Sequence, residues 1–229
     1  MTTLFINGKI SSGRGNETIL TSFRIDGSNF SAISNDLKPF DGEPVINLKG
    51  MLVLPGGIDP HVHFNTPGFE ERETFETGSA FAASGGITTV IDMPCTSLPP
   101  VTNVVNLENK LAAISGRSYI DYALWGGVSG NCFQGPDWAE NMEALWKAGV
   151  VGFKTYSLSG MPTFTHLTPA ELGEVMKFAG RFGILIGHHA EAAEIVLPIT
   201  QKLMSEGRVD AAAYALSREK RGIWPNCAP

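Results

Sequence analysis

The hydrophobic pattern of the chain changes near residue 50. Before that point, short apolar runs are separated by Asn-Gly and Asp-Gly pairs, which favour hairpin turns because these residues tolerate positive φ. The runs are Leu4–Ile10, Phe23–Ile25, Phe30–Ile33 and Val45–Leu48, and the pairs are Asn7-Gly8, Asp26-Gly27 and Asp41-Gly42. The pattern predicts a small antiparallel β unit over residues 1–50, too small to bury much apolar surface by itself.

From residue 51 onward, apolar runs alternate with amphipathic stretches of helical period. The expected strands are Val53–Ile58, Thr88–Met93, Ile120–Gly127, Val150–Tyr156 and Ile184–His188, each followed by a helix, near 74–84, 103–115, 138–148, 168–182 and 192–206. Such alternation predicts an α/β domain of parallel βαβ units. Five units suit an open doubly wound sheet, whereas a closed (β/α) barrel needs eight, and the pattern alone leaves both folds open. Both folds place active sites at the carboxyl ends of the strands.

Composition narrows the class of protein. The chain of 229 residues is 43% hydrophobic and 17% charged, as expected for a compact globular enzyme. Its net charge of −6, without a cluster of Lys or Arg, argues against nucleic acid. We see neither a secretory signal nor an apolar run of about 18 residues, so we expect no membrane span. Three widely spaced cysteines, Cys95, Cys132 and Cys227, suit a reducing cytoplasm and form no zinc motif.

The first candidate for chemistry is His61-Val62-His63, which directly follows an apolar run. Alternate residues of a strand point to the same side, so the two imidazoles can bind one cation. Imidazole suits zinc and similar divalent metals. The alternative is a pair of surface histidines at a strand end.

Two further polar clusters follow later strands. Lys154 closes an otherwise apolar strand, and His188-His189-Ala190-Glu191 follows the next one. An unpaired buried lysine is costly, so Lys154 needs a partner or a modification, unless its ammonium reaches water. A single histidine at a strand end is commonly a hydrogen-bonded structural residue. Three such clusters on one rim favour a shared site.

Four motifs together resemble the cyclic amidohydrolases, a group that includes allantoinase, hydantoinase (dihydropyrimidinase) and dihydroorotase. The motifs are Pro55–His63, Gly85–Pro94, Gly152–Lys154 and His189–Glu191. The resemblance runs from about residue 3 to about residue 217. It implies a metal-dependent (β/α)₈ barrel with a small β-sandwich built in part from residues 1–50. Residues 51–217 would form the partial barrel, and residues 218–229 a tail without family likeness.

The resemblance also implies a ligand set. His61 and His63 would bind the first of two divalent ions, expected to be Zn²⁺. Lys154, carboxylated by CO₂ to an anionic carbamate, would bridge both ions. His189 would bind the second ion, while its neighbour His188 faces the other way. A water molecule bridging two cations is acidified and can attack a ring amide carbon.

The chain departs from the family pattern in its second half. The family has a further metal-binding histidine after strand six and a general-base aspartate after strand eight, and we find neither. We therefore expect a truncated chain of about five βα units, produced by a frameshift, an early stop or a gene fragment. Its first and fifth strands would have unpaired edges, and the chain would be weakly stable with low or no activity.

The resemblance also bears on the ring. Where dihydroorotases carry an arginine and an asparagine for the substrate carboxylate, this chain has Asn65 and Cys95, so a ring with a neutral substituent is favoured. Ser159 stands where hydantoinases carry an oxyanion-binding tyrosine, and the pattern around Phe64-Asn65 looks most like allantoinases. Asn65 and Cys95 are therefore candidate substrate contacts. Alternatively, Asn65 caps a loop turn and Cys95 is ordinary packing.

The expected partner is a small cyclic amide or ureide, and a homo-oligomer typical of the family is open. Two functions of another class remain. One is a non-catalytic scaffold relative, although such proteins have substituted ligand residues, whereas His61, His63, Lys154 and His189 are retained here. The other is a doubly wound nucleotide-binding protein, which needs a Gly-rich turn after its first strand that this chain lacks.

Overall fold

A computed structural model describes residues 2–218, and the tail expected beyond residue 218, with Cys227, lies outside the described residues. Contacts divide the chain into two compact units, which meet in sequence between Gly56 and Gly57. The boundary between the units lies six residues after residue 50, where the hydrophobic pattern changes, because the intervening segment pairs with the first unit. Leu52 bridges to Lys9, and the Val53 amide donates to the Lys9 carbonyl at 2.8 Å. Each unit is described by itself.

The first unit is a four-stranded sheet in the order β3-β2-β1-β4. Its strands are β1 (Thr2–Ser11), β2 (Thr18–Asp26), β3 (Asn29–Ile33) and β4 (Val45–Asn47). The first three strands are antiparallel, as predicted, and Gly27 supplies the positive φ of 58° between β2 and β3. By contrast, β4 pairs with β1 in parallel, because a long connection returns it to the far side of β1.

The expected turn at Asn7-Gly8 is wrong, since both residues lie within β1. Asn7 has a φ of 57°, and the pairing of β1 with β2 shifts register between Phe5 and Gly8. A residue in the left-handed conformation inside a strand is typical of a β-bulge. An Asn-Gly pair can adopt that conformation in a bulge as readily as in a hairpin turn. A side chain at Gly8 would meet Leu48 Cδ1 at 2.8 Å, so the close approach of the next segment also requires glycine there.

A buried ion pair fixes the connection between β3 and β4. Arg24 Nε donates to Glu43 at 2.7 Å, and the guanidinium stacks on the Phe40 ring at 3.7 Å. The Arg24 hydrogen bond lowers the pKa of Glu43 to about 2, although burial opposes the shift. The lowered pKa ties the stability of this connection to pH.

We expect acid to loosen this connection through Glu43. A carboxyl whose pKa is lowered on folding stabilises the fold above its unfolded pKa, near 4.5, and loses that contribution as the pH falls towards 2. The protection factor of the Leu4 amide, which donates to the Pro44 carbonyl, should therefore fall over this range. Glu43→Gln should give this amide a lower protection factor at neutral pH and remove the pH dependence of that factor, whereas Glu17→Gln, at an exposed position, should match the wild type. Equal profiles for Glu43→Gln and the wild type would refute this coupling.

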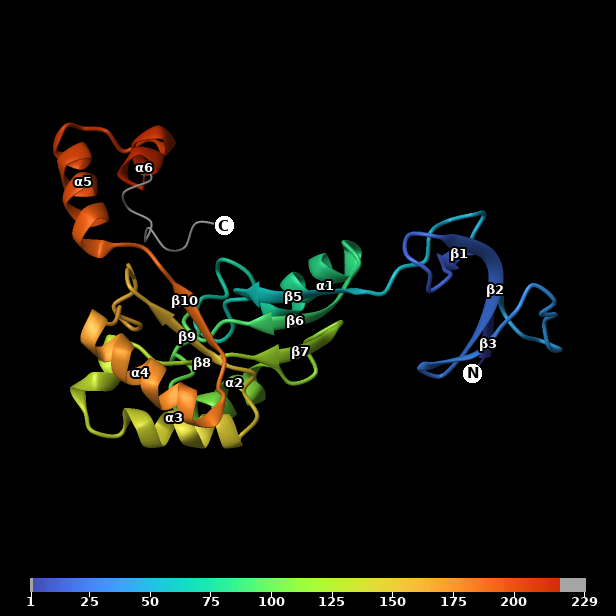
Figure 1. Ribbon diagram of the computed structural model, residues 1–229, viewed down its shortest axis with the longest axis horizontal. Coiled ribbons are helices and arrows are strands. Elements are labelled where there is room, and N and C mark those ends of the chain that lie inside the picture. Colours follow the sequence, from blue (N-terminus) through green and yellow to red (C-terminus); the bar gives the residue numbers. More distant parts are fainter. Residues whose placement is uncertain (1, 219–229) are drawn as a thin grey trace. The chain divides into compact units, whose positions relative to one another are not determined.

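The second unit contains parallel strands in the same order as in the sequence (Figure 1). The strands are β5 (Gly57–Val62), β6 (Ile87–Asp92), β7 (Asp121–Leu124), β8 (Gly126–Gly127), β9 (Phe153–Tyr156) and β10 (Ile186–His189). Trp125 interrupts one expected strand, giving β7 and β8. Because the Leu124 carbonyl accepts from the Val151 amide at 3.1 Å, the sheets β5-β6-β7 and β8-β9-β10 adjoin.

A helix follows each of the five strand positions, as the sequence predicts. The helices are α1 (Phe75–Ser84), α2 (Val104–Ile114), α3 (Trp138–Lys147), α4 (Pro169–Phe182) and α5 (Ala193–Ser205). A short 3₁₀ helix, η1 (Gly130–Gln134), and a last helix, α6 (Ala211–Ser217), were not predicted. The Thr168 side chain forms a capping box with Glu171 at the start of α4. Helices α5 and α6 pack against each other beyond the end of β10 (Figure 1).

The strand order decides between the two folds left open above. A doubly wound sheet reverses its strand order at a switch point, whereas these strands follow one another without reversal, as in a (β/α) barrel. The first strand was expected at 53–58 and lies at Gly57–Val62, because residues 51–53 pair with β1 instead. Within the described residues, β5 and β10 are the edge strands.

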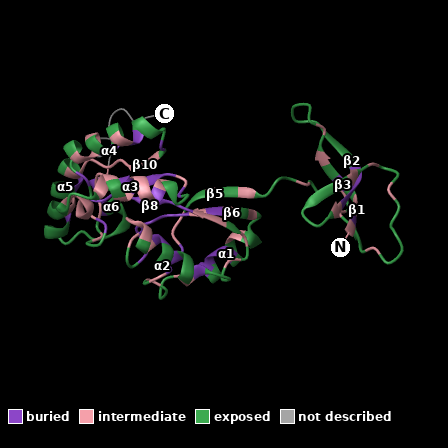
Figure 2. Ribbon diagram, turned by 90° about the horizontal axis from the view of Figure 1, so that it is seen from below, coloured by how far each residue is buried: buried purple, intermediate pink, exposed green. Residues whose placement is uncertain are grey.

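The core of the second unit lies between the strands and helices α1 to α4. Its buried members include Phe75, Val90, Leu145, Phe153 and Val175. Strands β8 and β9 are buried along most of their length, whereas β5 alternates between intermediate and exposed positions (Figure 2). The middle strands are therefore the more buried part of the sheet. Within residues 2–218, no helix is both long and apolar enough to cross a membrane.

Candidate active site

The two histidines of the first motif lie side by side at the end of β5. His61 belongs to the strand and His63 follows it, and their ring centroids are 5.4 Å apart. His63 Nδ1 is 3.1 Å from Thr96 Oγ1 and 3.8 Å from Cys95 Sγ, both on the loop after β6. His61 is exposed, whereas His63 is partly buried. The neighbouring loop therefore holds the His63 imidazole, whereas the His61 imidazole is exposed.

The register of β9 and β10 sorts the second and third motifs by face. Lys154 pairs with Gly187 and Tyr156 with His189, so Lys154, Tyr156 and His189 share one face. The Lys154 amine lies 5.1 Å from the centre of the Tyr156 ring, and the Tyr156 and His189 rings are 5.1 Å apart. His188 lies on the opposite face, where its Nδ1 is 2.8 Å from Thr155 Oγ1.

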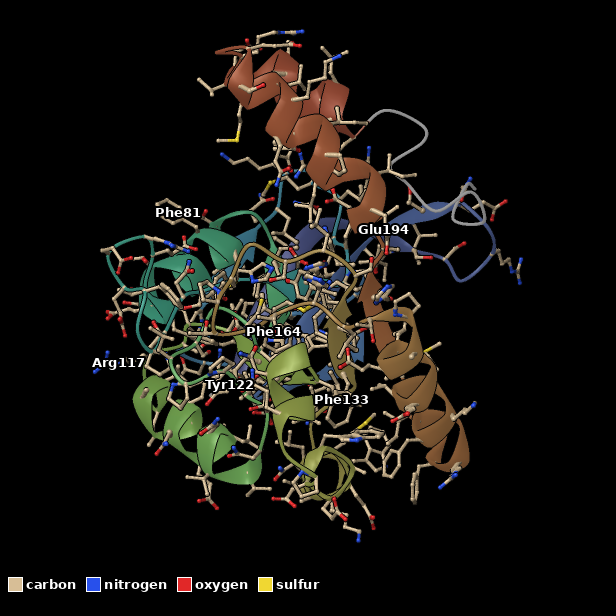
Figure 3. The ribbon with its side chains drawn as sticks, turned by 90° about the vertical axis from the view of Figure 1, so that its left-hand side faces the viewer. Phe81, Arg117, Tyr122, Phe133, Phe164 and Glu194 are labelled. Atoms are coloured by element: carbon tan, nitrogen blue, oxygen red, sulfur yellow. The ribbon has the colours of Figure 1, made fainter. Side chains whose placement is uncertain are left out.

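Cys95 and Tyr156 connect the two ends of the site. Cys95 Sγ is 3.2 Å from the Tyr156 hydroxyl, and the same sulfur contacts His63. Phe164 packs beneath them with an edge-on contact to Tyr156, and Figure 3 shows it in the middle of the side chains of this unit. A continuous chain of contacts therefore runs from β5 to β10.

His189 also takes part in an ionic contact at the edge of the site. Its Nε2 is 3.8 Å from Glu191, which accepts a hydrogen bond from Arg218 Nε at 3.2 Å. A cavity of about 350 Å³ adjoins this contact, and it lies between the first residues of α4 and of α5. The cavity is lined by Glu191 and by Glu194, which Figure 3 places at the start of α5, and not by His61 or Lys154.

The electrostatics of the cluster favour neutral imidazoles. Burial lowers the pKa of His63 to about 4, helped by the nearby charges of His61 and Lys154. Burial also lowers the pKa of His61, with Lys154 and His189 acting in the same direction and Asp59 opposing them. These histidines therefore keep a nitrogen lone pair at neutral pH, the form that binds metals.

Lys154 is the unusual charge of the site. Its residue is 3% exposed, and burial lowers the pKa of its amine. Within the described part of the chain, no carboxylate pairs with the Lys154 amine. The amine lies over the Tyr156 ring and interacts electrostatically with the Cys95 thiol. A buried amine beside two imidazoles is favoured in its neutral form, beside an anion, or after its own conversion to an anion.

These donors fit a divalent metal only if Lys154 contributes. Over residues 2–218, no group of three His, Cys, Asp or Glu side chains could hold a metal ion. Two imidazoles in contact and a partnerless buried amine have the chemistry of a site completed by a lysine carbamate. Such a carbamate would offer two oxygens where the amine now lies.

Comparison with known proteins gives the family. The model of the amidohydrolase family matches residues 52–212. The chain belongs to the amidohydrolase family. Its second unit is thus part of the family's fold.

Two curated relatives and one solved structure illustrate the kinds of protein to which this amidohydrolase is similar. Allantoinase from Solibacter usitatus is 38% identical over 85% of this chain and 41% of its own length. Dihydroorotase from Methanosarcina mazei is 34% identical over 81% of this chain and 39% of its own length. The structure of L-hydantoinase (dihydropyrimidinase) from Arthrobacter aurescens superposes with a TM-score of 0.83 at 29% identity, covering 96% of this chain and 47% of that one. The chain thus spans about two fifths of the length of these curated relatives.

The two candidate substrate contacts of this amidohydrolase behave differently. Asn65 has a φ of 57°, and its side-chain amide donates to the His63 carbonyl at 2.9 Å, as in the turn-capping alternative. Cys95 packs in the core with Met93 and Trp125, yet its sulfur contacts Tyr156 and His63. Of the two, Cys95 contacts side chains of the cluster, whereas Asn65 contacts only the backbone of His63.

A buried network behind the site was not predicted from the sequence. Lys110 and Asp92 are 1% and 0% exposed and form an ion pair, and Lys110 also donates to Ser97 Oγ at 2.6 Å. A signal was present, since Lys110 stands on the same helix face as Leu107 and Ile114, which are buried. A lysine on an apolar stripe points to a buried partner.

Proposed function

We propose that this chain carries the first part of a metal-dependent cyclic amidohydrolase site that opens a cyclic ureide ring, as an allantoinase does with allantoin. One observation carries the proposal: His61 and His63 at the end of the parallel strand β5 lie close enough to Lys154 on β9 for its charge to act on both imidazoles, and the buried lysine has no carboxylate partner among the described residues. The allantoinase relatives, at up to 39% identity, support the choice of ring chemistry.

In this proposal, His61 and His63 would hold one divalent ion, His189 would hold a second, and Lys154, as its carbamate, would serve both. When bound, such ions, most simply Zn²⁺, would supply an acidified water and polarise the amide carbonyl. The chain's own residues prepare the site. Burial keeps His63 neutral, and the strand register of β9 and β10 aims Lys154 and His189 to one face.

The loops favour a ring without a carboxylate. Asn65 and Cys95 offer no cation to bind one, which argues against dihydroorotate despite the 34% identical dihydroorotase. The Tyr156 hydroxyl lies inside the cluster, and burial, with Cys95, raises its pKa, so it stays a hydrogen-bond donor. A neutral ureido group can accept such a bond. The hydantoinase-type reaction is the second candidate, supported by the TM-score of 0.83.

Metal titration of the purified chain tests this site. We expect the wild type to bind Zn²⁺ in competition with a chromophoric chelator, with bicarbonate present. His61→Ala and His63→Ala should each weaken binding by more than the roughly 10–100-fold typical of losing an outer-shell partner. His166→Ala, at an exposed loop position, should bind as the wild type does.

Two results separate the alternatives. A wild-type chain that binds no Zn²⁺ contradicts the proposal and favours a scaffold relative. If Zn²⁺ binds, ring opening should be assayed with allantoin, hydantoin, dihydrouracil and dihydroorotate, with the chain at high concentration because it supplies four of the implied ligands. Preference for dihydroorotate would overturn the choice of ring.

We place this chemistry in the cytoplasm, on the strength of the unpaired thiols of Cys95 and Cys132. A homo-oligomer remains part of the proposal by family likeness. Sedimentation at several concentrations would test it.

A further inference from the structure

The Cys95–Ser97 loop contacts the ring of His63 through the Thr96 hydroxyl, with the Cys95 sulfur farther from the same nitrogen at 3.8 Å. Thr96 Oγ1 lies 3.1 Å from His63 Nδ1, and Thr96 is only 8% exposed, so water competes little for this bond. A histidine whose Nδ1 is engaged in this way has its Nε2 left for a ligand. Outer partners of this kind fix the tautomer and the ring orientation of metal-binding histidines.

The loop that carries Thr96 is itself anchored. The next residue, Ser97, is fully buried, and its hydroxyl accepts from Lys110 Nζ at 2.6 Å. Lys110 also pairs with Asp92, at the end of β6. Helix α2 thus holds the loop in place through a single ammonium group.

The same ion pair fixes the other side of His63. The second carboxylate oxygen of Asp92 accepts from the backbone amide of Phe64 at 2.8 Å. Phe64 directly follows His63, so this bond sets the backbone at the histidine. The ring contact and the backbone position of His63 therefore depend on one Asp92–Lys110 pair.

A buried ion pair is weak evidence for stability, because apolar residues of similar volume often replace it without loss. Its more informative property here is geometric. Among residues 2–218, the side-chain hydrogen bonds of the pair run to Ser97, to Phe64 and within the pair, and both outside partners adjoin residues that contact or form the site.

We propose that Thr96 is a positioning residue for His63: its hydroxyl accepts the Nδ1 proton and leaves Nε2 to bind metal, and the Lys110–Asp92–Ser97 network holds its loop in register. This inference rests on the proposed function, since it assigns a partner to one of its metal ligands. It predicts that the hydroxyl, and not the volume of the side chain, matters at position 96.

Two substitutions separate hydroxyl from volume. Thr96→Val keeps the shape without the hydroxyl, and we expect Zn²⁺ affinity about 10–100-fold weaker. Thr96→Ser keeps the hydroxyl and should stay within about threefold of the wild type, well short of that loss. Thr155→Val is the matched control, because it removes the same type of bond from His188, which faces away from the site. It should bind Zn²⁺ as the wild type does.

The metal-free chain gives a second measurement. Nitrogen-15 NMR of the histidine rings should show His63 protonated at Nδ1 in the wild type and in Thr96→Ser, and a shift towards Nε2 protonation in Thr96→Val. Equal Zn²⁺ affinity for the valine and serine variants, or an Nε2-protonated His63 in the wild type, would overturn the inference. A wild type that binds no Zn²⁺ but has the Nδ1 tautomer would instead contradict the proposed function alone, so the two failures are distinguishable.

Discussion

Replacing Lys110 by methionine is expected to lower the free energy of unfolding of the second unit by about 3–5 kcal/mol. The substitution leaves the Asp92 carboxylate fully buried with only the Phe64 amide as its partner. Burial already raises the pKa of Asp92, and Lys110 opposes that shift by attraction and by a hydrogen bond. Without the Lys110 ammonium, nothing from this residue offsets the free-energy cost of desolvating the Asp92 carboxylate.

The second substitution of a double-mutant cycle should reverse most of this loss. The double variant Asp92→Asn with Lys110→Met leaves no charge at this pair. The asparagine oxygen can still accept the hydrogen bond from the Phe64 amide. We expect the double variant to unfold within about 2 kcal/mol of the wild type, because neutral replacement of a buried pair is commonly tolerated. Urea titration followed by tryptophan fluorescence suits the test, since Trp125, Trp138 and Trp146 all lie in the second unit.

An exposed lysine provides the control. Lys147 pairs with Glu143 one helical turn away, and its side chain is 72% exposed. Lys147→Met should change the free energy of unfolding by no more than about 0.5 kcal/mol. If Lys110→Met and Lys147→Met unfold alike, the buried pair does not have the energetic role assigned to it.

Periodicity predicted the elements of the second unit because each helix and strand is long enough to bury one face. The predicted helices at 138–148 and 168–182 match α3 and α4 to within a residue or two. The first strand was placed too early, since an apolar run does not reveal which unit it joins. Residues 51–53 are as apolar as a barrel strand, yet they hydrogen-bond to β1.

The residues of the site also fall into those that the sequence predicted and those that it did not. The His-x-His pair and Lys154 could be found because their residue types are unusual at strand ends. Thr96 and Ser97 could not, since a Thr-Ser pair in a loop has no distinctive pattern and acquires its role only when α2 brings Lys110 against it. Tyr156 was not among the predicted site residues, although strand alternation already places it on the same face as Lys154.

The second large effect is expected at Lys154, and its sign on stability is opposite to that at Lys110. Lys154→Met should raise the free energy of unfolding by about 1 kcal/mol, within the range common for substitutions that relieve a functional compromise. The amine is buried without a carboxylate partner among the described residues, and burial lowers its pKa, whereas a methionine of similar volume has no charge to desolvate. Lys177→Met, on an exposed face of α4, should leave stability unchanged.

The same substitution should abolish the response of the chain to metal. With bicarbonate and Zn²⁺ at about 100 times Kd, the wild type should gain about 2.7 kcal/mol of stability from binding to the folded state alone. Lys154→Met should gain little, because the carbamate oxygens cannot form. A variant that is less stable than the wild type and yet still stabilised by Zn²⁺ would mean that Lys154 is an ordinary structural lysine. The opposite pair of results, higher stability with no metal response, is what a residue kept for chemistry rather than for folding predicts, and it is the sharpest contrast with Lys110 that this chain offers.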